Sequence, residues 1–475
     1  MSHLLGSPCA CLLLPENASN RWPSRRTGLL PLSYLPRTTH RHKAPVTVTE
    51  SATNSELLSA LFLHHFSPPT NSLTHHPRHV RVVTLCLFPS RSPRSLPNMA
   101  GYLLSKLGFD LKNQADNHDP GNNDDRLPPL PQLHISTEDH FPPSTQGTYP
   151  RLCQLSDGSL LKSYTTFGPD GERVLVVSRS VDQARSFEVV GEITRSHGDC
   201  DNCFLAELEP GVVLAAFRNH DLSGEDGNKP TWFRITVCRS RDGGRIWEYL
   251  SQAVEKGGSD GVWEPFVRIP VGRREEVQLY YSAEAEQGQR QDTMVVVSGD
   301  GGETWSEPRK ITGEEGLRDG MVGIAGMKDA VSGKEAMVMV LETTRCGPGR
   351  FSIEAVVSYD EGLSWASRQE VYKPFGEGKN AGAPQIGTLA GGEGVAVVFM
   401  TDEDGNEGVW PSGAKIKTVL GVGLGNGVIN WSREADTVFE EGSSWPGILG
   451  VGHGEALVVC ETRSRIGGRL LSLDL

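Results

Sequence analysis

Two glutamates in this 475-residue sequence stand where carboxyl chemistry is most easily built. Glu264 lies between Trp263 and Pro265, and Glu342 follows the apolar run 336–341. Apolar surroundings raise the pKa of a carboxyl group, which is what a proton donor needs at neutral pH. Two carboxyl groups facing one cleft fit hydrolysis of a glycosidic bond, in which one acts as general acid and the other as nucleophile or as base for water. We therefore take Glu264 and Glu342 as candidate catalytic residues.

The elements that would position these glutamates recur along the chain. Six units, spaced by roughly 53 to 62 residues, each contain a short entering strand, a Gly-rich turn and a strongly apolar returning strand. Units of this length predict an all-β, six-bladed propeller with four-stranded antiparallel blades around a channel. The entering strands begin near Tyr149, Asn202, Glu264, Met321, Ala383 and Trp445, and the returning strands cover 160–164, 212–217, 277–281, 336–341, 395–400 and 456–460.

The mouth of such a channel can be predicted from the same six units. In an antiparallel blade, the start of the innermost strand and the end of the second strand lie at the same rim. Polar and aromatic residues at these positions are the candidate binding residues, although any one of them alone is an ordinary solvated strand end. They are Arg151, Asp201, Arg218, His220, Trp263, Asp319, Arg345, Asn380, Gln385, Asp402, Trp445 and Glu461, with Asp199, Glu284 and Arg463 beside them.

Among these candidates, Trp263 and Trp445, together with Trp410, could offer faces on which sugars stack, or could fill gaps between blades. We expect neither a metal nor a cofactor. His220 and His453 have no His or Cys partner at ligand spacing, and Cys200 with Cys203 alone is weak evidence for zinc. The sequence also contains no Gly-x-Ser-x-Gly motif and no phosphate-binding loop.

A short motif repeats within the units. Ser-x-Asp-x-Gly-x-x-Trp occurs at 240–247, 298–305 and 358–365, and a diverged copy occupies 180–187. Its Asp can accept hydrogen bonds from the backbone of its own turn, its Gly tolerates positive φ, and its Trp can pack beneath the hairpin. We expect these segments to be structural turns. The motif resembles the Asp-box, or BNR repeat, of the sialidase-like superfamily, which implies a propeller and leaves the chemistry open.

A closer resemblance lies in four segments around the candidate site. Residues 261–266 (GVWEPF), 318–321 (RDGM), 340–343 (VLET) and 380–385 (NAGAPQ) are similar to the fungal exo-α-1,5-L-arabinanases of glycoside hydrolase family 93. The resemblance covers roughly residues 148–475. It implies a retaining enzyme that releases arabinobiose from linear arabinan through two glutamates. Glu264 would be the acid/base and Glu342 the nucleophile, or the two roles would be exchanged.

Two other interpretations remain open. A sialidase would need a tyrosine nucleophile in the last blade, but no tyrosine follows Tyr372. The segment 266–270 (FVRIP) is similar to the sialidase Phe-Arg-Ile-Pro motif, yet it stands in the third unit, where an ordinary strand is the better interpretation. A propeller that binds a glycan or a protein without catalysis is the third possibility. The two glutamates favour an enzyme.

Charge and composition divide the chain at Met99. Residues 1–98 hold 10 Lys and Arg against 3 Asp and Glu, a formal charge of +7, whereas the rest carries −20 of the total −13. Only 2 of the 54 glycines precede Met99, and the first 98 residues are rich in Pro, Ser, His and Arg. We expect a disordered leader there, with translation starting at Met99, and a loop-like lead-in over 99–129.

The acidic remainder argues against a nucleic-acid or anionic-membrane partner and for a monomer that takes an oligosaccharide or polysaccharide. No apolar run approaches the ~20 residues that cross a bilayer. The related arabinanases are typically secreted, but residues 4–14 make a poor signal peptide, so the compartment stays open. Cysteines within apolar runs, such as Cys153, Cys238 and Cys460, are expected to be buried thiols.

The sixth unit has one strand fewer than the others, so we expect the segment 130–136 to supply its outer strand. Removing residues 99–137 should therefore unfold the domain, which circular dichroism and thermal melting would detect. A truncated protein as soluble and as active as the full chain would contradict this expectation.

Overall fold

Six antiparallel β-sheets form the part of the chain that the computed structural model describes, residues 130–475 without 224–228, 274, 406–409, 453 and 475. The expected leader and lead-in lie outside the described residues. Blades 1 to 3 consist of β3 (Thr148–Gln154), β4 (Leu160–Phe167), β5 (Arg173–Ser180), β6 (Glu188–Ser196); β7 (Asp199–Glu209), β8 (Val212–Ser223), β9 (Lys229–Ser240), β10 (Glu248–Gly257); and β11 (Val262–Arg268), β12 (Val277–Ala285), β13 (Arg290–Ser298), β14 (Arg309–Thr312). Blades 4 to 6 consist of β15 (Asp319–Lys328), β16 (Glu335–Thr343), β17 (Ser352–Ser358), β18 (Ala366–Tyr372); β19 (Ala381–Leu389), β20 (Gly394–Thr401), β21 (Lys415–Gly425), β22 (Val428–Trp431), β23 (Asp436–Phe439); and β24 (Ser443–Gly452), β25 (Glu455–Thr462), β26 (Arg465–Leu473) with β1 (Leu133–Ile135) and β2 (Phe141–Gln146).

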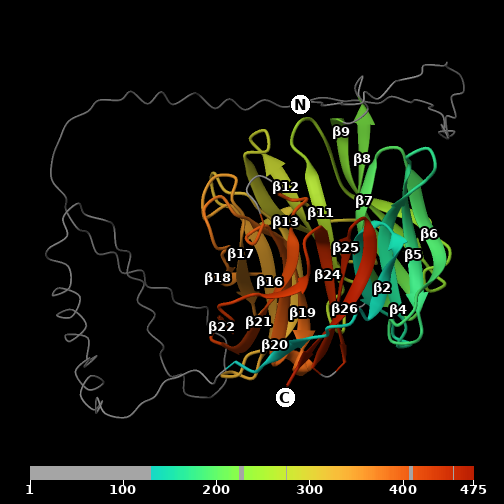
Figure 1. The fold of residues 1–475 in the computed structure, drawn as a ribbon. Coiled ribbons are helices and arrows are strands. Elements are labelled where there is room, and N and C mark those ends of the chain that lie inside the picture. The colour runs from blue at the N-terminus through green and yellow to red at the C-terminus, as the bar shows by residue number, and fades with distance from the viewer. Residues whose placement is uncertain (1–129, 224–228, 274, 406–409, 453, 475) are drawn as a thin grey trace, which may run out of the picture. The chain divides into compact units, whose positions relative to one another are not determined.

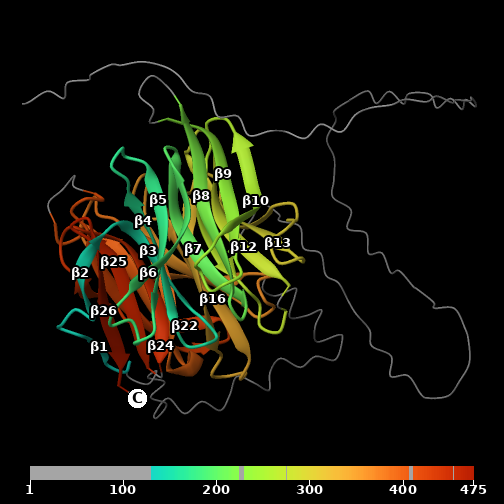
Figure 2. The same ribbon diagram turned by 90° about the vertical axis from the view of Figure 1, so that its right-hand side faces the viewer.

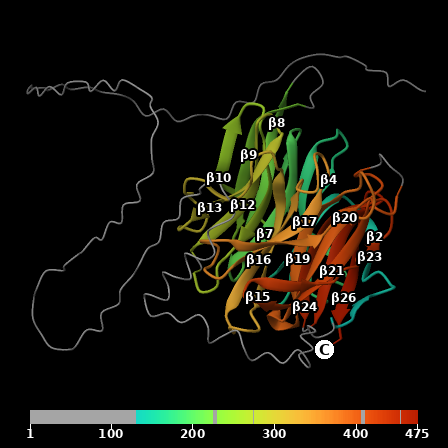
Figure 3. The same ribbon diagram turned by 90° about the vertical axis from the view of Figure 1, so that its left-hand side faces the viewer.

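The sheets are the blades of a six-bladed propeller, as the repeat spacing predicts. The first strand of each blade is innermost, and these strands contact one another in a closed ring in which β3 meets both β7 and β24. Figure 1 shows strands of consecutive blades next to one another, and Figure 3 shows β16 and β17 of blade 4 beside β19 to β21 of blade 5. Within the described residues the structure contains no helix that could span a membrane.

Strands from the two ends of the described chain complete the sixth blade. β1 and β2 both pair antiparallel with β26, with Leu133 opposite Leu473 and Phe141 opposite Gly468. Figure 2 shows β1 and β2 beside β26. The blade is therefore built from chain segments more than 300 residues apart, and the ring closes through hydrogen bonds between them.

Four turns between the third and fourth strands of a blade share one hydrogen-bond pattern. In blade 2, Ser240 donates its hydroxyl to Asp242 at 2.8 Å and accepts the N–H of Gly244 at 2.9 Å, while the N–H of Ile246 donates to Asp242 at 2.9 Å. The turns that begin at Ser180, Ser298 and Ser358 repeat this pattern. The diverged copy therefore keeps its turn, with Ala184 at φ +63° in the place of the glycine. These residues stabilise hairpins. The candidate catalytic residues lie elsewhere, at the rim where the inner strands begin.

The hydrophobic core lies between adjacent blades. One cluster joins Val340 of blade 4 to Val397 of blade 5, and others fill the remaining gaps. The cluster between blades 1 and 2 contains Cys153, Cys200, Cys203 and Cys238. All four are free and buried, and burial raises the pKa of their thiols, to about 12 for Cys153 and Cys238. These are inert core thiols.

Lys162 of β4 is an unusual member of the contact between blade 1 and the closing strand β2. Its side chain is buried, and its Nζ lies 4.1 Å from the ring centroid of Phe187 and 4.6 Å from that of Phe141. The described residues place no carboxylate on this ammonium group. Burial therefore lowers the pKa of Lys162 to about 8, and the aromatic faces offset only part of the lost hydration.

This shift predicts how stability depends on pH. The unfolded chain keeps Lys162 protonated up to pH 10.5, whereas the folded chain releases the proton near pH 8, so the free energy of unfolding should rise between these values. The shift corresponds to at most about 3 kcal/mol. Lys162→Met should be more stable than wild type below pH 8 and should lose this rise. Urea melts of both proteins at pH 7 and pH 10 test this, and equal pH dependence in the two would contradict it.

Candidate active site

Each inner strand begins with the same irregularity. Near the start of each inner strand one non-glycine residue has φ between +49° and +53°, and at each of these six residues the register between the first and second strands shifts. Such β-bulges redirect a side chain and concentrate at functional sites. The fold thus places six side chains at equivalent positions around one mouth: Tyr149, Asn202, Glu264, Met321, Ala383 and Trp445.

Glu264 is the charged member of this ring. One carboxylate oxygen, Oε1, accepts a hydrogen bond from Nη1 of Arg218 at 2.9 Å. The other, Oε2, is buried and has no hydrogen-bond partner among the described residues. Burial raises the pKa of Glu264, and the charges of Arg218 and Arg151 lower it. An orphaned buried carboxylate oxygen is costly, so the stability of the fold does not explain why Glu264 stands here.

Arg218 is held by carboxylates on every side. Its Nε donates to Asp199 at 3.3 Å and its Nη2 donates to Asp201 at 3.4 Å, while Nη1 reaches Glu264. Arg173 of β5 pairs with both aspartates from the other side, at 2.9 Å to Asp199. All three guanidinium nitrogens of Arg218 therefore donate to carboxylates of the protein itself. Arg218 and Asp201, which the sequence offered as substrate contacts, fix the position and charge of Glu264.

Glu342 lies at the end of β16 and faces the next blade. Its Oε2 accepts the backbone N–H of Ala383 at 2.8 Å, and no cation pairs with it among the described residues. Burial raises the pKa of Glu342 to about 7, and the negative charge of Glu264 contributes to the rise. The charge of Glu264 therefore reaches Glu342.

The three tryptophans have different surroundings. Trp445 stacks on Tyr149, with ring centroids 4.5 Å apart and planes at 19°. The Trp410 ring lies over Gly382, where a Cβ would be 3.2 Å from it. Trp263 packs edge-on against His220, and its buried indole nitrogen has no hydrogen-bond partner in the part of the chain that the structure describes. Trp445 and Trp410 are therefore placed near the glutamates as possible sugar platforms, whereas Trp263 fills the space between blades.

His220 and Arg151 are buried behind the mouth. His220 is 0% exposed, and its Nε2 is 2.9 Å from the carbonyl oxygen of Val262, so the neutral Nε2–H tautomer fits the contact. Burial lowers the pKa of His220 to about 4, which keeps the ring neutral. Arg151 donates to the carbonyl oxygens of Pro150 and Pro446 at 2.9 and 3.0 Å. Both residues bind backbone carbonyl groups of the strands that form the site. His220 is fully buried, so a ligand cannot reach it.

The remaining candidates tie the rim loops together. Asp319 is fully buried and forms a bidentate pair with Arg368 at 2.7 and 3.0 Å. Asp402 accepts the backbone N–H of Asn380 at 2.7 Å. Arg345 pairs with Glu354 of β17 at 3.1 Å and with Glu314. Glu461 lies on the opposite side of the mouth, where burial raises the pKa of its carboxyl group.

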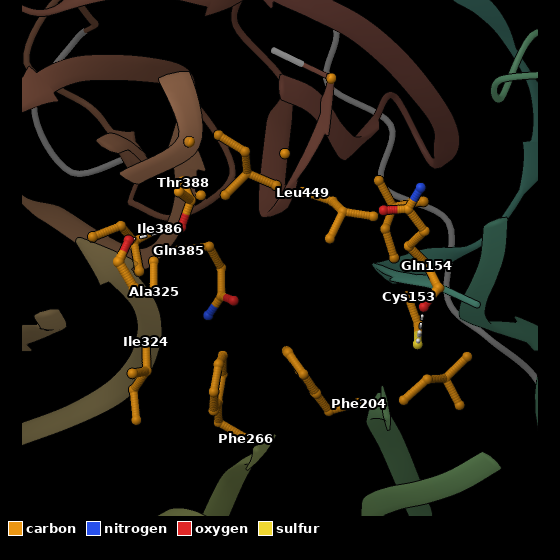
Figure 4. Close-up of a pocket in the computed structure, with 18 residues that line it drawn as sticks. Cys153, Gln154, Phe204, Phe266, Ile324, Ala325, Gln385, Ile386, Thr388 and Leu449 are labelled. Atoms are coloured by element: carbon orange, nitrogen blue, oxygen red, sulfur yellow. Dashed lines mark hydrogen bonds between the residues drawn. The ribbon is translucent and has the colours of Figure 1, made fainter. Parts of the chain in front are cut away.

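Gln385 faces the channel below the mouth. Its amide nitrogen donates to the carbonyl oxygens of Val322 and Pro384, at 3.3 and 2.9 Å. Figure 4 shows its side chain pointing into a cavity of about 550 Å³, toward Phe204 and Phe266. The centroids of these two rings are 4.3 Å apart, so they form part of an apolar lining under the polar mouth. Gln385 thus belongs to the channel, one layer below the glutamates.

Sequence reasoning missed several contributors. Arg173 and the N–H of Ala383 act on the glutamates through contacts that only the folded chain creates. Tyr149 could have been found, because it begins an inner strand in the same way as Glu264 and Trp445. A possible metal-ligand group, Asp170, Glu172 and His197, lies largely exposed on blade 1, where Glu172 pairs with Arg195. Among the described residues, no hydrogen bond or ion pair joins this group to Glu264 or Glu342.

Comparisons with known proteins concern the fold. No family model matches the sequence, and no curated protein matches it. An α-L-arabinofuranosidase of Fusarium graminearum in complex with an iminosugar inhibitor is 18% identical with a TM-score of 0.52, covering 71% of this chain and 97% of that one. An α-L-arabinanase of Penicillium chrysogenum complexed with arabinobiose is 18% identical with a TM-score of 0.50, covering 72% and 99%. A GH93 α-L-arabinofuranosidase of Fusarium graminearum in complex with arabinobiose is 17% identical with a TM-score of 0.51. This chain shares their six-bladed propeller, in agreement with the resemblance in its motifs.

Gly382 offers a precise test of the Glu342 position. A Cβ at Gly382 would lie 2.8 Å from Oε2 of Glu342, so Gly382→Ala should displace this carboxylate and lower kcat by about a hundredfold. At Gly326, on the neighbouring inner strand, a Cβ would meet nothing within 4 Å. Gly326→Ala is therefore the matched control and should keep wild-type activity. A fully active, correctly folded Gly382→Ala protein would contradict the placement of Glu342 in the site.

Proposed function

We propose that this chain is a retaining glycoside hydrolase that acts from the end of α-1,5-linked L-arabinofuranosyl chains and releases arabinobiose. The observation that carries the proposal is the pair of buried glutamates at one mouth. Among the described residues, one has a carboxylate oxygen without a hydrogen-bond partner, and the other has a pKa of about 7 and no ion pair. The motif resemblance and the shared propeller support arabinan as the substrate class.

The proposed reaction needs both glutamates in opposite protonation states. One carboxylic acid protonates the leaving glycosidic oxygen while the other carboxylate attacks the anomeric carbon, which gives a glycosyl-enzyme ester. Water then attacks this ester, and the first residue, now ionised, accepts the proton of the water. The Trp445 platform would bind a sugar face, and the buried network behind Glu264 would exclude water from the reacting centre.

Two assignments of these roles have different support. The resemblance gives Glu264 the acid/base role and Glu342 the nucleophilic role. The charges of the free protein favour the exchange: Arg218 offsets part of the rise that burial causes in the pKa of Glu264, whereas Glu342 keeps its proton up to about pH 7. The pair itself is common to both assignments.

Purified protein with linear arabinan tests the function. Wild type should release arabinobiose, and Glu264→Gln and Glu342→Gln should each lower kcat by about 10²- to 10⁴-fold while the fold is kept. Gly326→Ala, outside the pair, is the control and should keep wild-type activity. Unchanged activity in both variants would contradict the site. A wild type inactive on arabinosides and sialosides would favour a non-catalytic binding propeller.

Azide distinguishes the two role assignments. In alanine variants, azide replaces a missing nucleophile and gives a glycosyl azide of inverted configuration, whereas replacing a missing acid/base gives the retained product. Rescue of Glu342→Ala to the inverted azide would support the assignment from the resemblance. The same product from Glu264→Ala would support the exchanged roles.

A further inference from the structure

We infer that Tyr149 is a positioning residue of the proposed sugar site, which holds the Trp445 indole as a platform and Arg218 against Glu264. The inference rests on the proposed function and names a residue that the chemistry itself does not require. Tyr149 is the first of the six bulge residues, with φ +49°, and its ring is 7% exposed.

The first contact of Tyr149 is with the neighbouring bulge. Its ring lies parallel to that of Trp445 across the boundary between blades 1 and 6, at 4.5 Å and 19°. Trp445 is only partly buried, and its indole is held by Tyr149 on one side and by the core between blades 5 and 6. Stacking covers one indole face, and the exposed part of the ring is the part that a ligand could contact. A fixed aromatic ring binds at lower entropic cost than a mobile one.

The second contact of Tyr149 is with the charged network. The Arg218 guanidinium carbon lies 5.1 Å from the centroid of the Tyr149 ring, a distance typical of a cation–π pair. The charges of both Arg218 and Glu264 act on the Tyr149 hydroxyl. Tyr149 therefore touches the cation that fixes Glu264 and the indole that would bind the sugar. It connects the two sides of the mouth.

The backbone around Tyr149 keeps this arrangement rigid. Arg151 donates from one nitrogen to the carbonyl oxygens of Pro150, Trp445 and Pro446, at 2.9, 3.3 and 3.0 Å. The two strands also approach closely, since a Cβ at Gly447 would lie 2.7 Å from the carbonyl oxygen of Pro150. The two bulges are thus fixed side by side, and the closure of the ring at this boundary becomes part of the binding site.

The test compares two substitutions of Tyr149 with a matched control. Tyr149→Leu removes both ring contacts, Tyr149→Phe keeps the ring, and Tyr281→Leu removes a buried tyrosine from the core between blades 2 and 3. Tyr149→Leu should weaken arabinobiose binding, followed by tryptophan fluorescence, by about 2- to 12-fold, and should reduce the near-UV circular dichroism. It should also shift the pH dependence of kcat, because Arg218 loses a support. Tyr149→Phe should keep most of the binding and the near-UV signal.

A double-mutant cycle separates positioning from general stability. In a Trp445→Ala background, Tyr149→Leu should lose most of its effect on binding, because the platform is already absent. Tyr281→Leu should lower the melting temperature without changing binding or the pH profile. A folded Tyr149→Leu protein with wild-type binding and pH profile would overturn the positioning role alone. A wild type that neither binds arabinobiose nor hydrolyses arabinan would overturn the proposed function instead.

Discussion

The rest of the site depends on one backbone constraint, the left-handed residue at the start of each inner strand. For a residue with a side chain, this conformation costs about 1–3 kcal/mol, so six copies persist only because the blades around them enforce the register. Each bulge places one side chain at the same level of the propeller, where Ala383 and Trp445 also contact the core between blades 5 and 6. The same geometry that closes a propeller therefore presents Glu264, Trp445 and Tyr149 together, although they are up to 296 residues apart in the chain.

Charge then distinguishes the two glutamates. Glu264 belongs to a network of two arginines and two aspartates, in which Arg218 joins it to Asp199 and Asp201. Glu342 accepts one backbone N–H, and among the described residues the charge of Glu264 raises its pKa while that of Arg318 lowers it. Two carboxyl groups of the same type thus acquire different proton affinities from their surroundings, which is the general way in which one pair supplies both an acid and a nucleophile.

Much of this arrangement could be predicted from the sequence. The repeat spacing gave six blades and the position of every returning strand, because hydrophobic strands and glycine turns are local features. The six strand starts that it identified are the six bulge residues, Glu264 among them. What it could not give are the partners that lie across blades. His220 and Asp319 looked like polar rim residues, but their side chains turn inward and bond Val262 and Arg368, respectively. Only the packing of neighbouring blades determines such orientations.

The central claim is that Glu264 and Glu342 form a double-displacement pair. The stereochemistry of the first product tests this most directly, by following the anomeric protons with NMR while the purified protein hydrolyses linear arabinan. The account predicts that arabinobiose appears first as the α anomer, with retained configuration, and only later equilibrates. Initial formation of the β anomer would contradict the covalent mechanism and would leave one glutamate as a base for water.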